Sequence, residues 1–348
     1  IAPVLRQEGF VLSNQGIEDT EIGLLIGNDL INKILTGKTC RLSENLMLYE
    51  TIFGWVINGS SRGESASNCT LRRSETDEKI IQKFEENFSF ENGRCVTGLL
   101  WKREPVDLRD NFHLAKRQFD RFRGELKTNS FVRNQCEEII KFQKANNIVE
   151  ECNEGETGYF MPYRSVVRKD KSTTQVRLVF NCSSSKRGDL SLNDYLEQGP
   201  NLNPSLLDLL LKFRIFKVVF CGDIEKAFLM IGIAEDDRRH LRFLWNTNDK
   251  GKEYVVLQMN RVLFGSRCSP FLLRATIRYH VRKYLEKYPD CVDMLDNALY
   301  ADDLCYGAET VQESLSLSAG AISILKDAGF HLRKLCTNSR EHCGFKMA

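Results

Sequence analysis

The feature that most constrains this chain is a pair of adjacent carboxylates, Asp302 and Asp303, preceded by Tyr300 and followed by Leu304. We expect a tight β-hairpin with the acidic pair in its turn, because aspartate is a common turn residue. Neighbouring carboxylates repel, and each raises the pKa of the other unless a cation lies between them. The pair favours a Mg²⁺ site, since Mg²⁺ prefers carboxylate oxygens and keeps positions for water and phosphate. A solvated surface turn is the alternative.

A further carboxylate, Asp223, follows an apolar strand pattern that runs from Phe216 to Gly222. A carboxylate at a buried strand without a partner would pay a large desolvation cost. If the hairpin with Asp302 and Asp303 packs beside this strand, the three carboxylates come together. Such a set suits two Mg²⁺ ions, one at an attacking hydroxyl and one at a leaving pyrophosphate.

Composition places the chain among ordinary globular proteins. It has 348 residues, 42% hydrophobic and 28% charged, which allows two or three domains. The net charge is only +2, so any affinity for nucleic acid must come from a local basic surface. The 12 cysteines are scattered without C-x-x-C spacing, which signals neither a zinc site nor a disulfide framework. With no secretory signal and no apolar run of membrane-spanning length, we expect reduced thiols and an intracellular protein.

The first segment, residues 1–60, reads as apolar strands. Its run Ile22–Ile31 resembles the end of a retropepsin-type aspartic protease domain, and Ile52–Gly59 fits the strand that follows. The catalytic Asp-Ser/Thr-Gly is absent from the sequence. An acid protease needs two opposed carboxylates that share a proton. We therefore expect this remnant to be inactive. Polar residues 61–76 are predicted to be a linker.

Residues 77–150 show helical spacing of apolar residues and are predicted to form a helical connector. Strand patterns follow at Tyr163–Val167 and Val176–Phe180, with a cationic tip between them that contains Lys169 and Lys171. Lysine and arginine are the residue types that hold phosphates. A solvated charged turn is the alternative for this tip.

Two further turns are predicted to begin helices. Asn203-Pro204 precedes a helical pattern over residues 205–214. Gly265 permits a close backbone approach after a predicted strand, and Ser269-Pro270 is predicted to cap and start a helix over residues 271–284.

The order of these motifs resembles the fingers and palm of reverse transcriptases. The motifs are an Arg-containing strand, Asp223-x-x-x-Ala-Phe, Phe-Gly265-x-x-x-Ser-Pro, Tyr-Ala-Asp302-Asp and Ala328–Lys334. The runs Thr173–Ser184 and Ser191–Asp194 are most similar to the Pol polyprotein of BEL/Pao-type LTR retrotransposons. The resemblance implies an α+β fold in which residues 151–348 form right-hand polymerase fingers and palm, with an antiparallel palm sheet and helices, after a partial β-rich aspartic-protease-like segment.

The resemblance implies catalytic roles for five residues. Asp223, Asp302 and Asp303 would bind two Mg²⁺ ions, with Mn²⁺ as a substitute, and Ile224 would add its backbone carbonyl. Lys334 would donate a proton to the leaving pyrophosphate, and a surface lysine is its alternative.

The resemblance also implies a nucleotide site. Lys169 or Lys171, together with Arg177, would contact the triphosphate. Phe228 would exclude a ribose 2′-hydroxyl through its bulk, and Gly265 would line the template base and incoming nucleotide. Asn181 replaces an Asp common in the family, and Phe264 replaces a Gln of viral relatives.

The implied function is RNA-directed DNA polymerisation on an RNA template, with a DNA primer and dNTPs. Other Pol segments (protease, RNase H, integrase) are the implied partners, with no membrane, in a cytoplasmic virus-like particle or the nucleus. Because the family's thumb would follow Ala348, we expect weak primer-template binding by this chain alone. The alternatives are a catalytically impaired nucleic-acid-binding fragment, an aspartic protease and an RNA-directed RNA polymerase.

Overall fold

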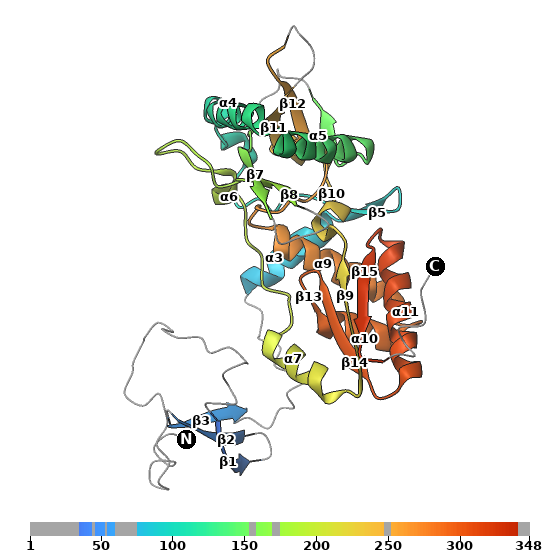
Figure 1. Cartoon of the computed structure of the whole chain (residues 1–348). Coiled ribbons are helices and arrows are strands. Elements are labelled where there is room, and N and C mark those ends of the chain that lie inside the picture. Colours follow the sequence, from blue (N-terminus) through green and yellow to red (C-terminus); the bar gives the residue numbers. More distant parts are fainter. Residues whose placement is uncertain are drawn as a thin grey trace. The chain divides into compact units, whose positions relative to one another are not determined.

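The computed structural model describes residues 35–43, 46–52, 54–59, 75–152, 158–168, 175–246 and 252–339. Its contacts divide the chain into two units, Ile1–Arg73 and Ser74–Ala348 (Figure 1). Helices and strands are mixed throughout the second unit, which confirms the α+β class. Within the described ranges no helix is long and apolar enough to span a membrane.

In the first unit the described residues form one antiparallel sheet of β1 (Leu35–Ser43), β2 (Leu46–Thr51) and β3 (Gly54–Gly59), in the order β1-β2-β3. The predicted strand at residues 52–59 is observed from Gly54. The run Ile22–Ile31 lies outside the described residues. The protease relationship of this unit stays a prediction.

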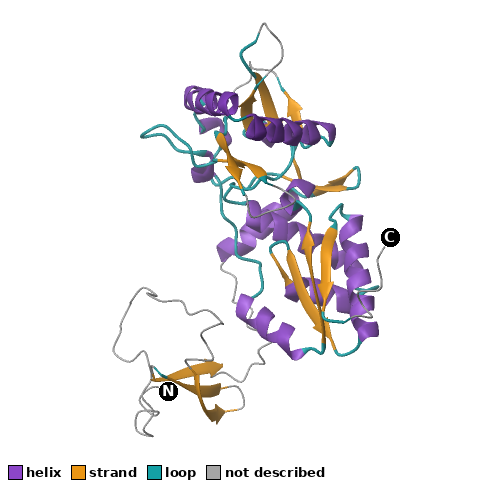
Figure 2. Cartoon of the chain, in the orientation of Figure 1, coloured by secondary structure: helices purple, strands orange, loops and turns teal. Residues whose placement is uncertain are grey.

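The second unit contains a four-stranded antiparallel sheet in the order β13-β14-β9-β15. Its strands are β9 (Val218–Ile224), β13 (Leu299–Tyr300), β14 (Asp303–Ala308) and β15 (Leu332–Thr337). Helices α10 (Pro289–Ala298) and α11 (Val311–Asp327) contact β14, and α11 also contacts β9 (Figure 2). Along β9, Phe220, Gly222 and Ile224 are buried and the residues between them are partly exposed. This alternation shows that one face of the sheet is covered and the other is open.

The remaining strands form three smaller sheets, β10-β5-β4, β11-β12-β6 and the hairpin β7-β8. The strands are β4 (Ser89–Glu91), β5 (Arg94–Thr97), β6 (Val149–Glu151), β7 (Tyr163–Val167), β8 (Val176–Phe180), β10 (Gly232–Ile233), β11 (Arg242–Trp245) and β12 (Val255–Met259). Both strands of the β7-β8 hairpin have the predicted bounds.

The connector predicted for residues 77–150 is helical over most of its length. Its helices are α3 (Glu75–Glu86), η2 (Pro105–Asp107), α4 (Phe112–Thr128) and α5 (Ser130–Ala145). The helical spacing of apolar residues extends to Phe88, but α3 ends at Glu86. The later helices are α6 (Leu192–Tyr195), α7 (Leu206–Ile215), η3 (Ala227–Met230), α8 (Glu235–Arg238), α9 (Ser269–Val281) and η4 (Arg282–Tyr284).

Two predicted helix starts differ in detail from the observed ones. Helix α7 is capped by Ser205, whose side chain accepts from the Asp208 amide at 3.4 Å, and not by Asn203-Pro204. Helix α9 does begin at Ser269, but the Ser269 hydroxyl donates to the Leu263 carbonyl at 2.7 Å and caps nothing. A serine hydroxyl has several possible acceptors nearby, and its choice depends on the fold around it.

The fold depends on a continuous apolar core, and Phe330 is one of its fully buried members, at 0% exposed. We expect Phe330→Ala to lower the free energy of unfolding by about 3–5 kcal/mol, because it removes a buried ring and leaves a cavity. Chemical denaturation followed by circular dichroism measures the loss. The matched control is Phe131→Ala on α5, where the ring is 47% exposed and the change should stay within about 0.5 kcal/mol. Equal losses in the two variants would contradict this assignment of the core.

Candidate functional site

Asp223 and Asp303 lie side by side on neighbouring strands. In the antiparallel ladder of β9 and β14 they are direct partners. Directly opposed residues of an antiparallel pair place their side chains on the same face of the sheet. The turn residue Asp302 is also tied to β9, because the Ile224 amide donates to the Asp302 carbonyl at 2.8 Å. The structure thus brings together the three acidic residues that the sequence analysis selected, as well as Ile224.

The apolar residues that precede the acidic pair contribute only a short first strand to this hairpin. Only Leu299 and Tyr300 form β13, whereas Met294, Leu295 and Ala298 belong to α10 and are buried. An apolar run of this length fits a strand or a buried helix face equally well. Only the two residues of β13 therefore separate the end of α10 from the acidic turn.

The carboxylates repel one another in this arrangement. Burial raises the pKa of Asp303, and the charges of Asp302 and Asp223 raise it further, whereas Lys334 lowers it. Among the described residues, no group of three His, Cys, Asp or Glu side chains is arranged to hold a metal ion by itself. The oxygen donors nevertheless fit Mg²⁺, which is commonly held by one or two carboxylates with water and substrate phosphates as its remaining ligands.

Lys334 is directed at the carboxylates by a β-bulge. The register of β15 against β9 shifts between Arg333 and Cys336, and Lys334 has a positive φ of 53° there. The Lys334 Nζ lies 3.3 Å from Asp223 Oδ2. Its side chain is 72% exposed, so this ion pair contributes at most about 1 kcal/mol to stability. A bulge with a left-handed non-glycine residue beside a carboxylate pair is instead typical of a functional site.

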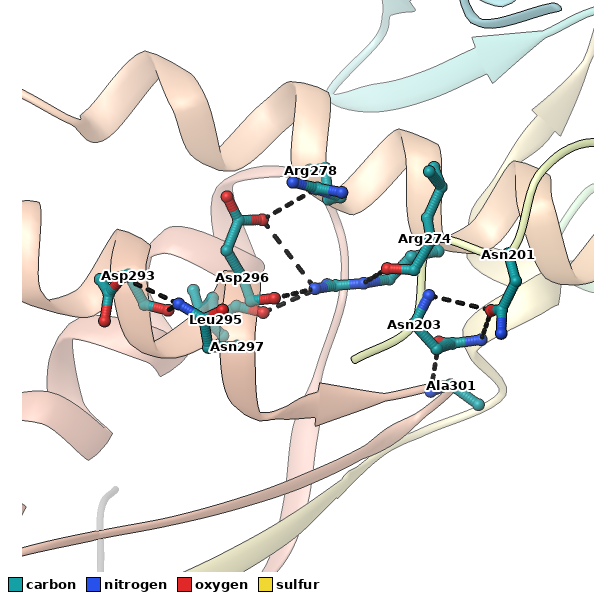
Figure 3. Close-up of polar contacts among 10 residues, drawn as sticks. Asn201, Asn203, Arg274, Arg278, Asp293, Leu295, Asp296, Asn297 and Ala301 are labelled. Carbon is teal, nitrogen blue, oxygen red and sulfur yellow. Dashed lines mark hydrogen bonds and ion pairs between the residues drawn. The ribbon is translucent and has the colours of Figure 1, made fainter. Parts of the chain in front are cut away.

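The acidic turn is held from outside by Asn203. Ala301 has a positive φ of 53°, and its amide donates to Asn203 Oδ1 at 3.0 Å. Asn201 Oδ1 in turn accepts from the backbone amide and the side-chain amide of Asn203 at 3.1 and 3.2 Å (Figure 3). In the sequence, Asn203 signals only the start of a helix, so this role was not predicted.

Arg274 connects the loop that carries Asn203 to the end of α10. Its guanidinium donates to the backbone carbonyls of Leu202, Leu295 and Asp296 at 3.3, 3.1 and 2.6 Å (Figure 3). The side chain is 1% exposed, and burial lowers its pKa to about 10. One sequence signal could have identified Arg274 as a connecting residue, namely its place within the apolar run Phe-Leu-Leu-Arg-Ala. An arginine buried with such a run requires hydrogen-bond partners.

Gly265 lies where only glycine fits. Its φ is +112°, and a Cβ at this position would lie 2.8 Å from the Phe180 carbonyl oxygen. Asn193 spans the same turn, since its Nδ2 donates to the Gly265 carbonyl at 3.1 Å and its Oδ1 accepts from the Arg267 amide at 2.8 Å. The turn is therefore docked against the end of β8. Asn193 is a second supporting residue that the sequence analysis did not assign.

The other predicted nucleotide-site residues are Phe228, Arg177, Lys169 and Lys171. Phe228 lies in η3, partly buried, and its ring meets that of Phe264 edge-on, with centroids 5.1 Å apart. Phe264 is 74% exposed, and its ring covers one edge of the contact with Phe228. Arg177 is exposed on β8. Lys169 and Lys171 lie outside the described residues, and the roles of all these residues stay predictions.

Removing the Asn203 side-chain oxygen should loosen the acidic turn. In Asn203→Ala the Ala301 amide loses its acceptor, and we expect faster hydrogen exchange in the segment around Ala301, measured by mass spectrometry. Asn297→Ala is the control, because the Asn297 amide bonds only within α10, to Asp293, among the contacts in Figure 3. Unchanged exchange in Asn203→Ala would show that the turn does not depend on this bond.

The raised pKa of Asp303 predicts a pH-dependent cost to folding. Below about pH 3.9, the ordinary aspartate pKa, Asp303 is protonated in both states and costs nothing. As pH rises towards the higher pKa of the folded protein, the unfolded chain loses its proton more readily, so stability falls. Asp303→Asn should therefore melt at a higher temperature than the unsubstituted protein at pH 7, with the gain vanishing below the ordinary pKa. The exposed Asp107→Asn is the control, and an equal gain there would refute the prediction.

Comparisons with known proteins were made for the whole chain. No protein-family model matches the sequence, and no curated protein matches it significantly.

Proposed function

We propose that this chain is the reverse transcriptase segment of a BEL/Pao-type retrotransposon polyprotein, an RNA-directed DNA polymerase with right-hand fingers and palm. The observation that carries the proposal is the register of the central sheet, which pairs Asp223 with Asp303 and ties the Asp302 turn to Ile224. A solvated acidic turn has no need of a second strand that presents a carboxylate directly opposite it. Burial and the charges of Asp302 and Asp223 raise the pKa of Asp303, and Lys334 lowers it.

Asp223, Asp302 and Asp303, with the carbonyl of Ile224, would hold two Mg²⁺ ions, for which Mn²⁺ could substitute. When bound, the ions would favour deprotonation of a primer 3′-hydroxyl and neutralise charge on the triphosphate. The open face of the sheet leaves these carboxylates accessible to a primer end and to a dNTP. Positioning and charge neutralisation carry most of the rate in phosphoryl transfer, so little covalent work falls to the protein.

The remaining side chains have complementary roles in this proposal. Lys334, which is paired with Asp223, would give its proton or its charge to the leaving pyrophosphate. Phe228, supported edge-on by Phe264, would exclude a 2′-hydroxyl and so select deoxynucleotides. Gly265 lets the backbone approach the nucleotide, and Arg177 offers a guanidinium to its phosphates. Template binding would be independent of sequence, through phosphates and groove shape.

Primer extension on a homopolymeric RNA template, with Mg²⁺ or Mn²⁺, tests the proposal. The unsubstituted chain should extend a DNA primer with dNTPs in preference to rNTPs. Asp302→Asn should reduce extension at least about 100-fold, because it removes charge that is needed only when the metal and phosphates are bound. Asp107→Asn on η2 is the matched control and should retain activity.

The other outcomes separate the alternatives. Equal use of rNTPs would favour an RNA-directed RNA polymerase. Absence of extension by the folded, unsubstituted chain, with RNA binding that does not depend on Mg²⁺, would identify a catalytically impaired nucleic-acid-binding fragment.

A further inference from the structure

The open face of the central sheet carries three thiols in a row beside the carboxylates. In the strand registers, Cys221 of β9 is opposite Cys305 of β14 on one side and opposite Cys336 of β15 on the other. Direct partners share a face, and Cys221 shares its face with Asp223 because the two are two residues apart on one strand. Cys336 is exposed, and Cys221 and Cys305 are half-buried.

The spacing of these strands suits a cross-strand disulfide. Directly opposed residues in an antiparallel pair have Cα atoms about 4.5–5.5 Å apart, depending on their place in the ladder. A disulfide joins Cα atoms about 4.4–6.8 Å apart, so the strands need not move. Between the two neighbours of Cys221, exposure favours Cys336, because Cys336 is exposed to a reagent whereas Cys305 is half-buried.

Exposure separates this group from the core thiols. Four other cysteines are at most 1% exposed and are shielded from reagents by the surrounding apolar side chains: Cys95, Cys136, Cys182 and Cys268. Structural cysteines of that kind are inert, whereas reversible oxidation to a disulfide requires an accessible thiol and a second thiol close enough to resolve it. Cys336, exposed on β15 with Cys221 as its resolving partner, has both properties.

We propose that Cys221 and Cys336 are a reversible thiol modification site, at which a peroxide converts the pair into an intramolecular disulfide. The Cys336 sulfur attacks the peroxide O–O bond, so that the sulfur is oxidised to a sulfenic acid and hydrogen peroxide is reduced to water. The Cys221 thiol then attacks the Cys336 sulfur, the S–S bond forms and a second water leaves. A dithiol reductant reverses the reaction by thiol–disulfide exchange.

The bond would tie β15 to β9 beside the bulge that carries Lys334. Cys336 is two residues from Lys334, and Cys221 is two residues from its ion-pair partner Asp223. Disulfide formation itself does not depend on the proposed polymerase function. The disulfide is detected on the thiols themselves and not through enzyme activity. Its absence and a failure of the polymerase proposal are therefore separate results.

The test uses the full chain treated with hydrogen peroxide at low protein concentration. Remaining thiols are alkylated, and the protein is digested without reduction and analysed by mass spectrometry. We expect a peptide pair joined through Cys221 and Cys336, with labelling of both thiols lost together and restored by dithiothreitol. Cys305→Ser should retain the link, and Cys336→Ser should lose it, with circular dichroism as the check on folding.

Three results would overturn the proposal. The first is alkylation of both Cys221 and Cys336 after peroxide treatment, and the second is a link from Cys221 to Cys305 in the unsubstituted chain. The third is a link from Cys336 to a cysteine other than Cys221, or to a second copy of the chain.

Discussion

The pairing of β14 with β9 is the interaction on which the rest of the site depends. Its register places Asp303 opposite Asp223 and Cys305 opposite Cys221. Because side chains alternate along a strand, a slip of one residue would turn Asp303 into the covered face and bring Leu304 onto the open one. The buried residues of β14 oppose that slip, since Leu304 and Ala308 are both 0% exposed and would leave the core. The hydrophobic core thus sets the geometry of the carboxylates.

A polar network outside the sheet, made by Asn203 and Arg274, supports the acidic turn that follows β13. The tight turn at Ala301 requires a left-handed residue, and the bond to Asn203 compensates part of that cost. Arg274 satisfies two carbonyls near the end of α10 and the carbonyl of Leu202 in the loop that carries Asn203. Buried cations are tolerated only when such partners are present. The network therefore positions the acidic turn, and none of its residues is a proposed metal ligand.

The open face of the sheet combines like charges, a lysine and thiols within a few residues. Burial and repulsion among the carboxylates disfavour the charged form of Asp303, and Lys334 offsets only part of this effect. Functional sites commonly retain such unfavourable electrostatics because the missing charge arrives with the ligand. The adjacent thiols share the accessibility that the proposed polymerase chemistry needs, which is why this face is also the place where oxidation is expected.

The sequence by itself predicted the bounds of the β7-β8 hairpin from local periodicity. From the cost of unpaired carboxylates it also predicted that Asp223 lies beside the turn with Asp302 and Asp303, whereas the α+β class was what the resemblance to reverse transcriptases implies. Only the tertiary structure decided which side chains support them. The bond from Asn203 to Ala301 spans 98 positions and that from Lys334 to Asp223 spans 111, so no local pattern reports either. Cys221, Cys305 and Cys336 likewise come from three strands that are far apart in the chain. Their thiols are brought together by the strand register, which core packing sets.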